Sequence, residues 1–340
     1  MKSSSHIRIT SQGEIMYRIT LLSPFFGEKF PPTFPVLLNS LKDNPTIKFV
    51  IPTDIDFSTI DNISNVQFVK TSLPALKHKI DLMLGYHAHI ISPYKLVDFK
   101  PTYGILFNEY IKDSEWWGYF DMDLVFGNIS RFLTEDLLDS YDRIFTHGHL
   151  TLYRNNELVN NLWNYKYHLH EVPNFQTVAT HKAIFAFDEW GWGKNKGRGI
   201  SYALHQVPLV RQFDDISFFA DLTPNLFSFR TTNGTNITKF EYYQGSLAGI
   251  DQLQNKHPYL YVHFQKRTMT NDVTDYTKPI YIVPNMFLNK IPVSIDLMKE
   301  RSVWTVQQKM RRSKQIKSNL SLSYFWRRIR FAFSEGRNHK

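Results

Sequence analysis

Short apolar runs alternate with helix-type segments between residues 17 and 120, and this alternation constrains the fold more than any other feature of the sequence. The predicted strands are 17–23, 47–51, 66–69 and 116–120, and the predicted helices are 34–41, 73–84 and 95–110. Such alternation predicts an α/β fold with a mostly parallel sheet flanked by helices. Ligands bind such sheets at the carboxyl ends of the strands. Asp54, Asp121 and Asp123 follow closely on predicted strands and are therefore the first candidates for a ligand site.

Beyond residue 123 the pattern is less regular. We predict a short helix at 133–138, a strand and turn at 144–154, irregular α+β structure at 155–260 and a late strand at 259–264. One domain is predicted at 16–295. Residues 1–15 are largely polar, lack the apolar core of a signal peptide and are predicted to be a disordered extension, with Met16 as an alternative start. No run of about 18 apolar residues exists, so no transmembrane helix is expected.

Two carboxylates separated by one residue follow the apolar run 116–120, in the sequence WWGYFDMDLVFG. Mg²⁺ and Mn²⁺ prefer oxygen ligands and often share them with the phosphates of a substrate. Asp121 and Asp123 could therefore hold a divalent cation, or one of them could bind a sugar hydroxyl. The alternative is an acid-rich turn, because Asp-X-Asp is a common tripeptide. Its position after the fourth predicted strand favours the metal site.

Six segments of the sequence carry a resemblance to a known group of enzymes. They are SPFFGEKFPPTFPVLLNSL (23–41), PYKLVDFKPTYGILF (93–107), WWGYFDMDLVFGNISRFL (116–133), FTHGHLTLYRNN (145–156), FAFDEWGW (185–192) and YVHFQKR (261–267). Together they resemble DXD-containing glycosyltransferases of the GT-A type, from the bacterial capsular and lipopolysaccharide biosynthesis group. The resemblance implies a GT-A-like (Rossmann-like) catalytic domain. It also implies transfer of a sugar, as in a hexosyltransferase, from a nucleotide-diphosphate sugar to a glycan or lipid-linked acceptor.

The resemblance further implies roles for individual residues. The donor-binding residues would be Pro24, Phe25, Phe26, Asp54, Lys95, Asp98, Lys100, Asp121 and Lys266. Among them, Asp98 would face the sugar as a catalytic residue, and a lysine would meet the phosphates. Asp121, Asp123 and the late His263 would hold Mn²⁺ or Mg²⁺, which neutralises the charge of the leaving diphosphate. A structural histidine at a strand end is the alternative for His263.

Asp188, Glu189 and Trp190 place two adjacent carboxylates beside an indole. Indole rings stack well on sugars, and a carboxylate can accept the proton of an attacking hydroxyl. Asp188 is the preferred catalytic base and Glu189 the second candidate; the alternative is a surface acid pair next to a packed tryptophan. His147 and His149 are predicted to bind the acceptor together with Trp190. They are not predicted to bind a metal, because no third ligand is adjacent in the sequence.

Other polar stretches are less specific. The glycine-rich stretch 191–199 lacks the spacing of a phosphate-binding loop and is predicted to be a surface loop, with a mobile loop over the donor or acceptor as the alternative. Asp214, Asp215 and Asp221 are also predicted to lie in loops. The sequence contains no cysteine, which excludes disulfides, thiolate catalysis and cysteine-ligated zinc.

The formal net charge of +9 is concentrated at one end of the chain. Residues 301–340 hold 11 basic side chains and one acidic side chain, whereas residues 1–300 hold 29 basic and 30 acidic ones. If segment 320–333 is helical, one apolar face holds Leu322, Phe325, Trp326, Ile329 and Phe333. We predict that 296–340 is a basic amphipathic tail that associates with an anionic membrane surface rather than with nucleic acid. The alternative is a terminal helix that packs its aromatic side chains on the domain.

The predicted function is that of a cytoplasmic, metal-dependent glycosyltransferase of surface polysaccharide synthesis, peripheral on the inner face of the plasma membrane. Through the resemblance, the late histidine and the Lys/Asp helix imply retention of the anomeric configuration. Two other classes stay open at this point. One is a non-catalytic carbohydrate-binding or scaffold protein of the assembly machinery, and the other is a metal-dependent phosphohydrolase or nucleotidyltransferase that uses the same Asp pair.

Overall fold

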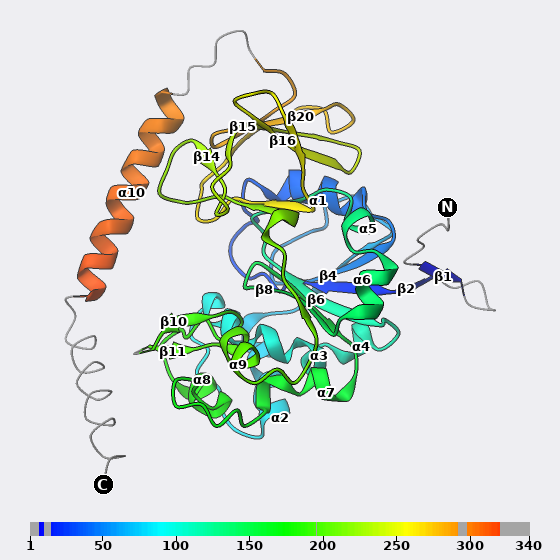
Figure 1. The fold of residues 1–340 in the computed structure, drawn as a ribbon, viewed down its shortest axis with the longest axis vertical. Coiled ribbons are helices and arrows are strands. Elements are labelled where there is room, and N and C mark those ends of the chain that lie inside the picture. Colours follow the sequence, from blue (N-terminus) through cyan, green and yellow to red (C-terminus); the bar gives the residue numbers. More distant parts are fainter. Residues whose placement is uncertain (1–6, 10–14, 195, 292–297, 320–340) are drawn as a thin grey trace.

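A computed structural model of the protein describes residues 7–9, 15–194, 196–291 and 298–319. Its central sheet has the strand order β12 (Gln212–Phe213), β8 (Arg143–His147), β9 (Leu150–Arg154), β6 (Trp116–Phe120), β3 (Ile19–Leu22), β4 (Ile47–Thr53) and β5 (Val66–Lys70). Strands β6, β3, β4 and β5 are parallel neighbours. Strand β9 runs antiparallel to β6 and β8, and β12 is parallel to β8. The four strands predicted from the alternation therefore lie side by side in one α/β layer (Figure 1).

Helical segments cover both faces of this sheet (Figure 1). The first face carries α2 (Leu73–Leu84), η1 (Pro93–Thr102), α3 (Tyr103–Leu106), α4 (Asn108–Ile111), α7 (Glu157–Asn160), η2 (Leu162–Asn164), α8 (Phe175–Thr180) and α9 (Ile200–Gln206). The second face carries α1 (Phe34–Lys42), α5 (Ile129–Phe132) and α6 (Glu135–Ser140). Trp117 and Tyr119 of β6 pack into the first core and Trp116 and Phe120 into the second, because successive side chains of a strand point to opposite faces.

The prediction of one helix at 95–110 is wrong. The chain there forms three short segments, η1, α3 and α4, of which η1 is a 3₁₀ helix. Pro101 lies inside η1. A proline has no N–H to donate and its ring clashes with the preceding turn, so it interrupts a continuous α-helix. Segment η1 also buries three charged side chains, those of Lys95, Asp98 and Lys100.

The expectation of a mostly parallel sheet holds for β6, β3, β4 and β5, and β12 and β8 form one further parallel pair of the central sheet. A three-stranded sheet joins β13 (Phe219–Asp221), β18 (Tyr261–His263) and β7 (Leu124–Phe126). A further, largely antiparallel sheet holds β14 (Phe229–Arg230), β15 (Asn236–Tyr243), β16 (Ser246–Asp251), β17 (Lys256–Pro258), β19 (Thr270–Asp272), β20 (Ile280–Val283) and β21 (Met286–Leu288). The two-residue turn Gln244-Gly245 joins β15 to β16 with positive φ at both residues, the conformation that favours antiparallel hairpins.

Three smaller elements complete the described domain. Strands β1 (Ile7–Ile9) and β2 (Ile15–Tyr17) pair antiparallel, so the described part of the predicted extension 1–15 is a strand. Strands β10 (Gly191–Gly193) and β11 (Gly197–Arg198) form a hairpin in the glycine-rich stretch. The 3₁₀ segment η3 (Ile216–Phe218) leads into β13.

Helix α10 (Met298–Asn319) contains the polybasic part of the tail and runs alongside the rest of the molecule (Figure 1). Trp304 packs edge-on against Phe227, and the Gln308 side-chain amide donates a hydrogen bond to the Pro224 carbonyl oxygen over 2.7 Å. The predicted amphipathic segment 320–333 lies outside the described residues. Among the helices of the described ranges, none is long and apolar enough to cross a membrane.

Candidate active site

Strand register brings three distant segments together at one point of the three-stranded sheet. Asp123 directly precedes β7, in which Leu124 lies opposite His263 of β18. On the other side of β18, Asp221 of β13 lies opposite the same histidine. Asp123 is further fixed because its carbonyl oxygen accepts a hydrogen bond from the Phe264 N–H over 2.9 Å. His263 therefore stands between two carboxylates that come from different strands.

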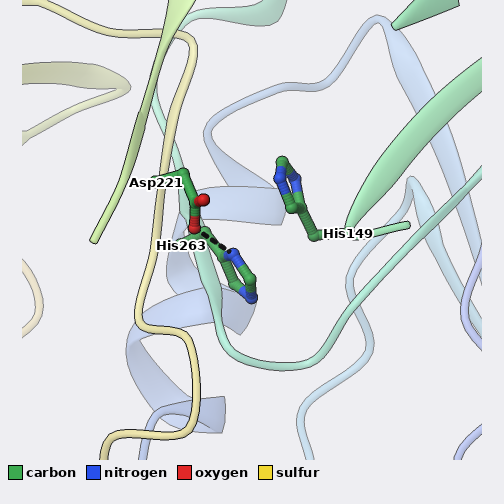
Figure 2. Close-up of side chains that lie close together, drawn as sticks. All are labelled: His149, Asp221 and His263. Atoms are coloured by element: carbon green, nitrogen blue, oxygen red, sulfur yellow. Dashed lines mark hydrogen bonds and ion pairs between the residues drawn. The ribbon is translucent and has the colours of Figure 1, made fainter. Parts of the chain in front are cut away.

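The two ring nitrogens of His263 face these two carboxylates. Nδ1 lies 2.7 Å from Asp221 Oδ1, a contact drawn as a dashed line in Figure 2, and Nε2 lies 3.5 Å from Asp123 Oδ1. Burial would lower the pKa of His263, but Asp123 and Asp221 outweigh it and raise the pKa to about 10. Burial would likewise raise the pKa of Asp123, and the charge of His263 lowers it instead. The carboxylates of Asp121 and Asp123 and a nitrogen of His263 lie within 4.8 Å of one another, a set of ligand atoms that can close around a divalent cation.

His149 lies next to this group and is buried, with 7% of its surface exposed. Its backbone carbonyl accepts a hydrogen bond from the Asp121 N–H over 3.0 Å, and its Nδ1 lies 2.9 Å from the Tyr261 hydroxyl. The ring centroids of His149 and His263 are 4.5 Å apart (Figure 2). Burial, together with the charges of His263 and other neighbours, holds the pKa of His149 well below its ordinary value, so its imidazole is neutral.

The predicted pair His147 and His149 divides between two environments. The imidazole rings of His147 and His149 stack across the turn between β8 and β9, with 5.3 Å between their centroids. His147 is half-buried and its Nε2 lies 3.2 Å from Asp214 Oδ1, whereas His149 faces His263. The structure therefore places Asp221 of β13 and His263 of β18 near His149, which the local sequence did not indicate.

A second cluster of charges lies beside Asp121. The Lys100 ammonium group donates to Asp121 Oδ1 over 2.6 Å and to the Gly148 carbonyl oxygen over 2.7 Å, and it lies 3.5 Å from Asp188 Oδ2. The main-chain carbonyl of Asp188 accepts a hydrogen bond from the Tyr119 hydroxyl over 3.1 Å. A side chain at residue 148 would place its Cβ 2.8 Å from Asp188 Oδ2, so glycine at this position leaves room for the Asp188 carboxylate. The structure thus brings Lys100, Asp121 and Asp188 together.

Burial and neighbouring charges shift the pKa values of the acids in this cluster. Burial is the main reason that the pKa of Asp188 rises to about 8, with Glu189 and Asp121 adding to the rise and Lys100 opposing it. Burial also raises the pKa of Glu189. Burial would lower the pKa of Lys100, yet Asp121 and Asp188 raise it above its ordinary value, so Lys100 stays charged. A carboxyl whose pKa lies near neutrality is suited to act as a general base or acid.

Lys95 and Asp98 occupy a different position from the one predicted. Both are buried, and the Lys95 ammonium group donates to Asp98 Oδ2 over 2.7 Å and to the Val178 and Ala183 carbonyl oxygens. The Asp98 carboxylate accepts hydrogen bonds from the Phe185 and Phe187 backbone N–H groups. All these partners are protein groups, and Asp98 is 0% exposed. The contacts hold the segment before Asp188 in place, and they do not favour the predicted contact of Asp98 with a sugar.

This interior ion pair makes a prediction about stability. Changing Asp98→Asn would leave the Lys95 ammonium group buried without its counter-charge, and removal of one partner of a buried ion pair costs about 3–5 kcal/mol. We expect a loss of this size in the free energy of unfolding measured by urea denaturation. The matched double variant with Lys95→Met should recover part of the loss because it removes the unpaired charge. A single variant that loses less than about 1 kcal/mol would contradict this role.

The predicted donor loop lies at the same edge of the sheet as Asp121. The Ser23 hydroxyl donates to the Phe120 carbonyl oxygen over 2.7 Å, which ties the end of β3 to the end of β6. The Gly27 N–H donates to Asp54 Oδ1 over 3.0 Å, which brings the end of β4 against the same loop. Pro24 and Phe25 are half-buried here, whereas Phe26 is buried in the core with 5% of its surface exposed.

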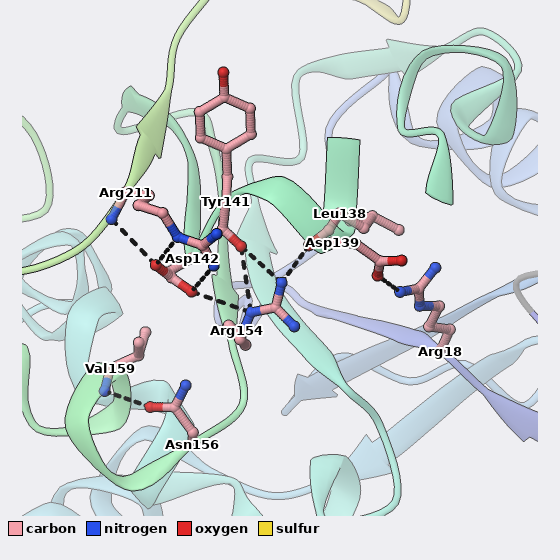
Figure 3. A network of polar contacts seen from close by, with 9 residues as sticks. All are labelled: Arg18, Leu138, Asp139, Tyr141, Asp142, Arg154, Asn156, Val159 and Arg211. Atoms are coloured by element: carbon pink, nitrogen blue, oxygen red, sulfur yellow. Dashed lines mark hydrogen bonds and ion pairs between the residues drawn. The ribbon is translucent and has the colours of Figure 1, made fainter. Parts of the chain in front are cut away.

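The other predicted residues lie at the rim or elsewhere. Trp190 is 37% exposed and its Nε1 donates to the Thr146 hydroxyl over 3.3 Å. Lys266 is exposed, three residues beyond His263. Arg154, at the opposite end of β9 from His149, donates to the Leu138 and Tyr141 carbonyl oxygens and pairs with Asp142, a structural network shown in Figure 3.

Two functional candidates were missed by the sequence reasoning. Asp221 was assigned to a loop, although it ends the apolar run Phe219-Ala220 just as Asp121 ends the run 116–120. That repeated pattern is the signal that could have identified it. Tyr261, which positions His149, carries no such signal because a tyrosine in an apolar strand is ordinary core.

The chain belongs to a protein family described as a family of unknown function, DUF6625, whose model matches residues 21–291. The match covers β4 to β21, including the residues around His263 and those around Lys100 and Asp188. No curated protein matches the chain. The functional conclusion therefore rests on the arrangement of the side chains.

Proposed function

We propose that this protein is a metal-dependent glycosyltransferase that moves a sugar from a nucleotide-diphosphate donor to a glycan or lipid-linked acceptor. The observation that carries the proposal is the position of Asp121 and Asp123 at the end of β6, between His263 on one side and the Lys100–Asp188 cluster on the other. Asp121, Asp123 and His263 suit a cation and a diphosphate. Asp121, Lys100 and Asp188 form the group that suits an attacking hydroxyl, so Asp121 belongs to both groups.

The strand order supports a GT-A-like domain. Along β5, β4, β3 and β6 the parallel strands follow the order third, second, first, fourth of the chain's predicted strands. This is the order of the first four strands of a dinucleotide-binding sheet, in which ligands bind beyond the carboxyl ends of the strands, where the strand order reverses between the first and the fourth. The loop after β3, Asp54 after β4 and Asp121 after β6 all lie at that edge, so the nucleotide would bind across Pro24, Phe25 and Asp54.

The residues fit a divalent cation. Asp121 and Asp123 would supply oxygen ligands and His263 a nitrogen ligand, a combination that suits Mn²⁺ and also accepts Mg²⁺. When bound, such an ion stabilises the negative charge that develops on a leaving diphosphate. Lys100 orients the Asp121 carboxylate and keeps a positive charge beside it. Lys266 is exposed and would extend this positive region toward the phosphates.

The acceptor would bind on the side of Asp188 and Glu189. Asp188 is proposed as the base that accepts the proton of the acceptor hydroxyl, with Glu189 as the second candidate. Trp190 offers an exposed indole at the rim, on which a sugar ring can stack. We propose retention of the anomeric configuration, following the resemblance to retaining enzymes with a late histidine; nuclear magnetic resonance of the first product anomer would show it.

Calorimetric titration with a panel of nucleotide sugars, each with and without Mn²⁺, tests the proposed function. We expect one nucleotide class to bind, at least about tenfold more tightly with Mn²⁺. Product analysis with an acceptor glycan should then show sugar transfer coupled to release of the nucleoside diphosphate. Hydrolysis to a sugar phosphate and a nucleoside monophosphate would instead favour a phosphohydrolase. Glycan binding without donor binding would favour a non-catalytic carbohydrate-binding protein.

We propose that the basic tail places the enzyme on an anionic membrane surface, where a lipid-linked acceptor would lie. The exposed side chains of α10 include the apolar Val303, Val306 and Met310 and several lysines and arginines. Each basic side chain near such a surface contributes on the order of 1 kcal/mol.

Deletion of 301–340 is therefore expected to abolish co-sedimentation with vesicles that contain phosphatidylglycerol. Turnover of a soluble acceptor should stay within about twofold, since the tail carries none of the cluster residues. Vesicles of neutral lipid serve as the control for the charge. Equal sedimentation of the full and shortened chains with the anionic vesicles would overturn the assignment.

A further inference from the structure

The imidazole of His263 lies between two different sets of ligand atoms. On its Nε2 side are the carboxylates of Asp121 and Asp123. Asp221 lies on its Nδ1 side, and His149, Asp221 and His263 (Figure 2) each offer one ligand atom within 4.8 Å of the other two. The first set is mainly oxygen. The second set, with two imidazoles and one carboxylate, is mainly nitrogen.

The second set has the chemistry of a zinc site. Two histidines and one carboxylate with an open fourth position are a recurring ligand set for Zn²⁺, and metal–nitrogen and metal–oxygen bonds of 2.0–2.2 Å place neighbouring ligand atoms about 3.3 Å apart. Asp221 Oδ1 and His263 Nδ1 are already 2.7 Å apart. The ligand atom of His149 lies within 4.8 Å of those of Asp221 and His263, so a movement of about 1.5 Å or less would bring it to this spacing.

His149 is prepared for such a role by its surroundings. A metal ligand must be a neutral imidazole with a free lone pair. Nδ1 of His149 pairs with the Tyr261 hydroxyl, and when Nδ1 carries the proton of this hydrogen bond, Nε2 keeps the lone pair. Pairing of the second ring nitrogen with a protein group is how metal-binding histidines are oriented.

We propose that His149, Asp221 and His263 form a second cation site, specific for Zn²⁺, that excludes the Mn²⁺ site of Asp121, Asp123 and His263. The exclusion follows from the shared ring. A ring that binds a metal has released one proton, so the imidazole of His263 then has one lone pair, at Nδ1 or at Nε2, and its other nitrogen carries a proton. When Asp221 accepts the Nδ1 proton, the Nε2 lone pair is available to the Asp pair. When Zn²⁺ takes Nδ1, the proton moves to Nε2, which then cannot bind Mn²⁺.

This inference rests on the proposed function only in that the Mn²⁺ site is taken to serve sugar transfer. Zn²⁺ would then inhibit sugar transfer by preventing Mn²⁺ from binding. The inference is tested on the full chain without donor or acceptor, by calorimetric titration with Zn²⁺ and with Mn²⁺ separately. His149→Asn is expected to weaken Zn²⁺ binding at least about tenfold and to change Mn²⁺ binding by less than about threefold. Asp123→Asn should do the reverse. His78→Asn, at an exposed histidine of α2, is the matched control and should change neither.

Competition on the wild-type chain gives a second measurement that needs no variant. Addition of Zn²⁺ to the Mn²⁺-loaded protein should raise the electron paramagnetic resonance signal of free Mn²⁺. If Asp123→Asn weakens Zn²⁺ as much as Mn²⁺, or if His149→Asn leaves Zn²⁺ binding unchanged, the second site does not exist. If Zn²⁺ binds without displacing Mn²⁺, the exclusion is overturned. Failure of sugar transfer with these metal results intact would overturn the proposed function alone.

Discussion

Replacement of Asp123 by asparagine is expected to lower metal-dependent turnover of the nucleotide-sugar donor by about 10³-fold. Asp123 faces His263 Nε2 and supplies one of the two carboxylates of the proposed Mn²⁺ site. Asparagine keeps the size of the side chain but removes the negative charge, so the cation loses both a ligand and its electrostatic complement. Release of the nucleoside diphosphate at saturating Mn²⁺ measures the effect.

The same variant should remain folded, because Asp123 is half-exposed and its structural hydrogen bond to Phe264 uses the backbone carbonyl. Asp136→Asn, at an exposed acid of α6, is the matched control for loss of one negative charge and should retain full turnover. Turnover of Asp123→Asn within tenfold of the wild type, with a wild-type response to Mn²⁺, would remove the metal role of this residue.

The part of the site that could be predicted is the part that depends on local sequence. The apolar run 116–120 ends in Asp121, and a strand buried on both faces reads as a continuous apolar run. Parallel packing of β3, β4 and β6 then places the donor loop, Asp54 and Asp121 at one edge. These positions follow from element type and order alone.

The partners of His263 could not be predicted in the same way. Its contacts depend on the register of β18 against both β7 and β13, and register is set by tertiary packing rather than by spacing along the chain. A one-residue slip would turn His263 away from Asp123 and Asp221. The sequence identified the histidine through a family resemblance, whereas its second carboxylate was assigned to a loop.

Lys95 and Asp98 illustrate the opposite case, in which a pattern along the chain suits two roles. A lysine and an acid three residues apart before the Asp-X-Asp strand match a donor-binding pattern. The same spacing also suits an interior ion pair. The choice between the two depends on whether other chain segments supply hydrogen bonds. Here Val178, Ala183, Phe185 and Phe187 do so through their backbones, and only the folded structure brings that segment over η1.

Replacement of Asp188 by asparagine is expected to lower kcat/KM by about 10²–10⁴-fold, the contribution of a general base. Asp188→Asn should also remove the acidic limb from the pH profile of kcat/KM. Burial raises the pKa of Asp188 to about 8, so at pH 6–7 most of this carboxyl is protonated and cannot accept a proton. The wild-type kcat/KM should therefore rise about tenfold per pH unit below about pH 8 and level off above it, since this parameter reports the free enzyme.

The control variant is Glu189→Gln, which removes the neighbouring carboxyl. Burial is the main cause of the raised pKa of Asp188, and the charge of Glu189 adds to the rise. Glu189→Gln should therefore move the break in the pH profile to lower pH without abolishing it. Calorimetric Mn²⁺ affinity should change little in either variant, because neither residue belongs to the cation group. A pH profile of Asp188→Asn that keeps the wild-type break would show that another group titrates there. Loss of the break in Glu189→Gln but not in Asp188→Asn would assign the base to Glu189, since the proton acceptor must be the group whose removal abolishes the titration.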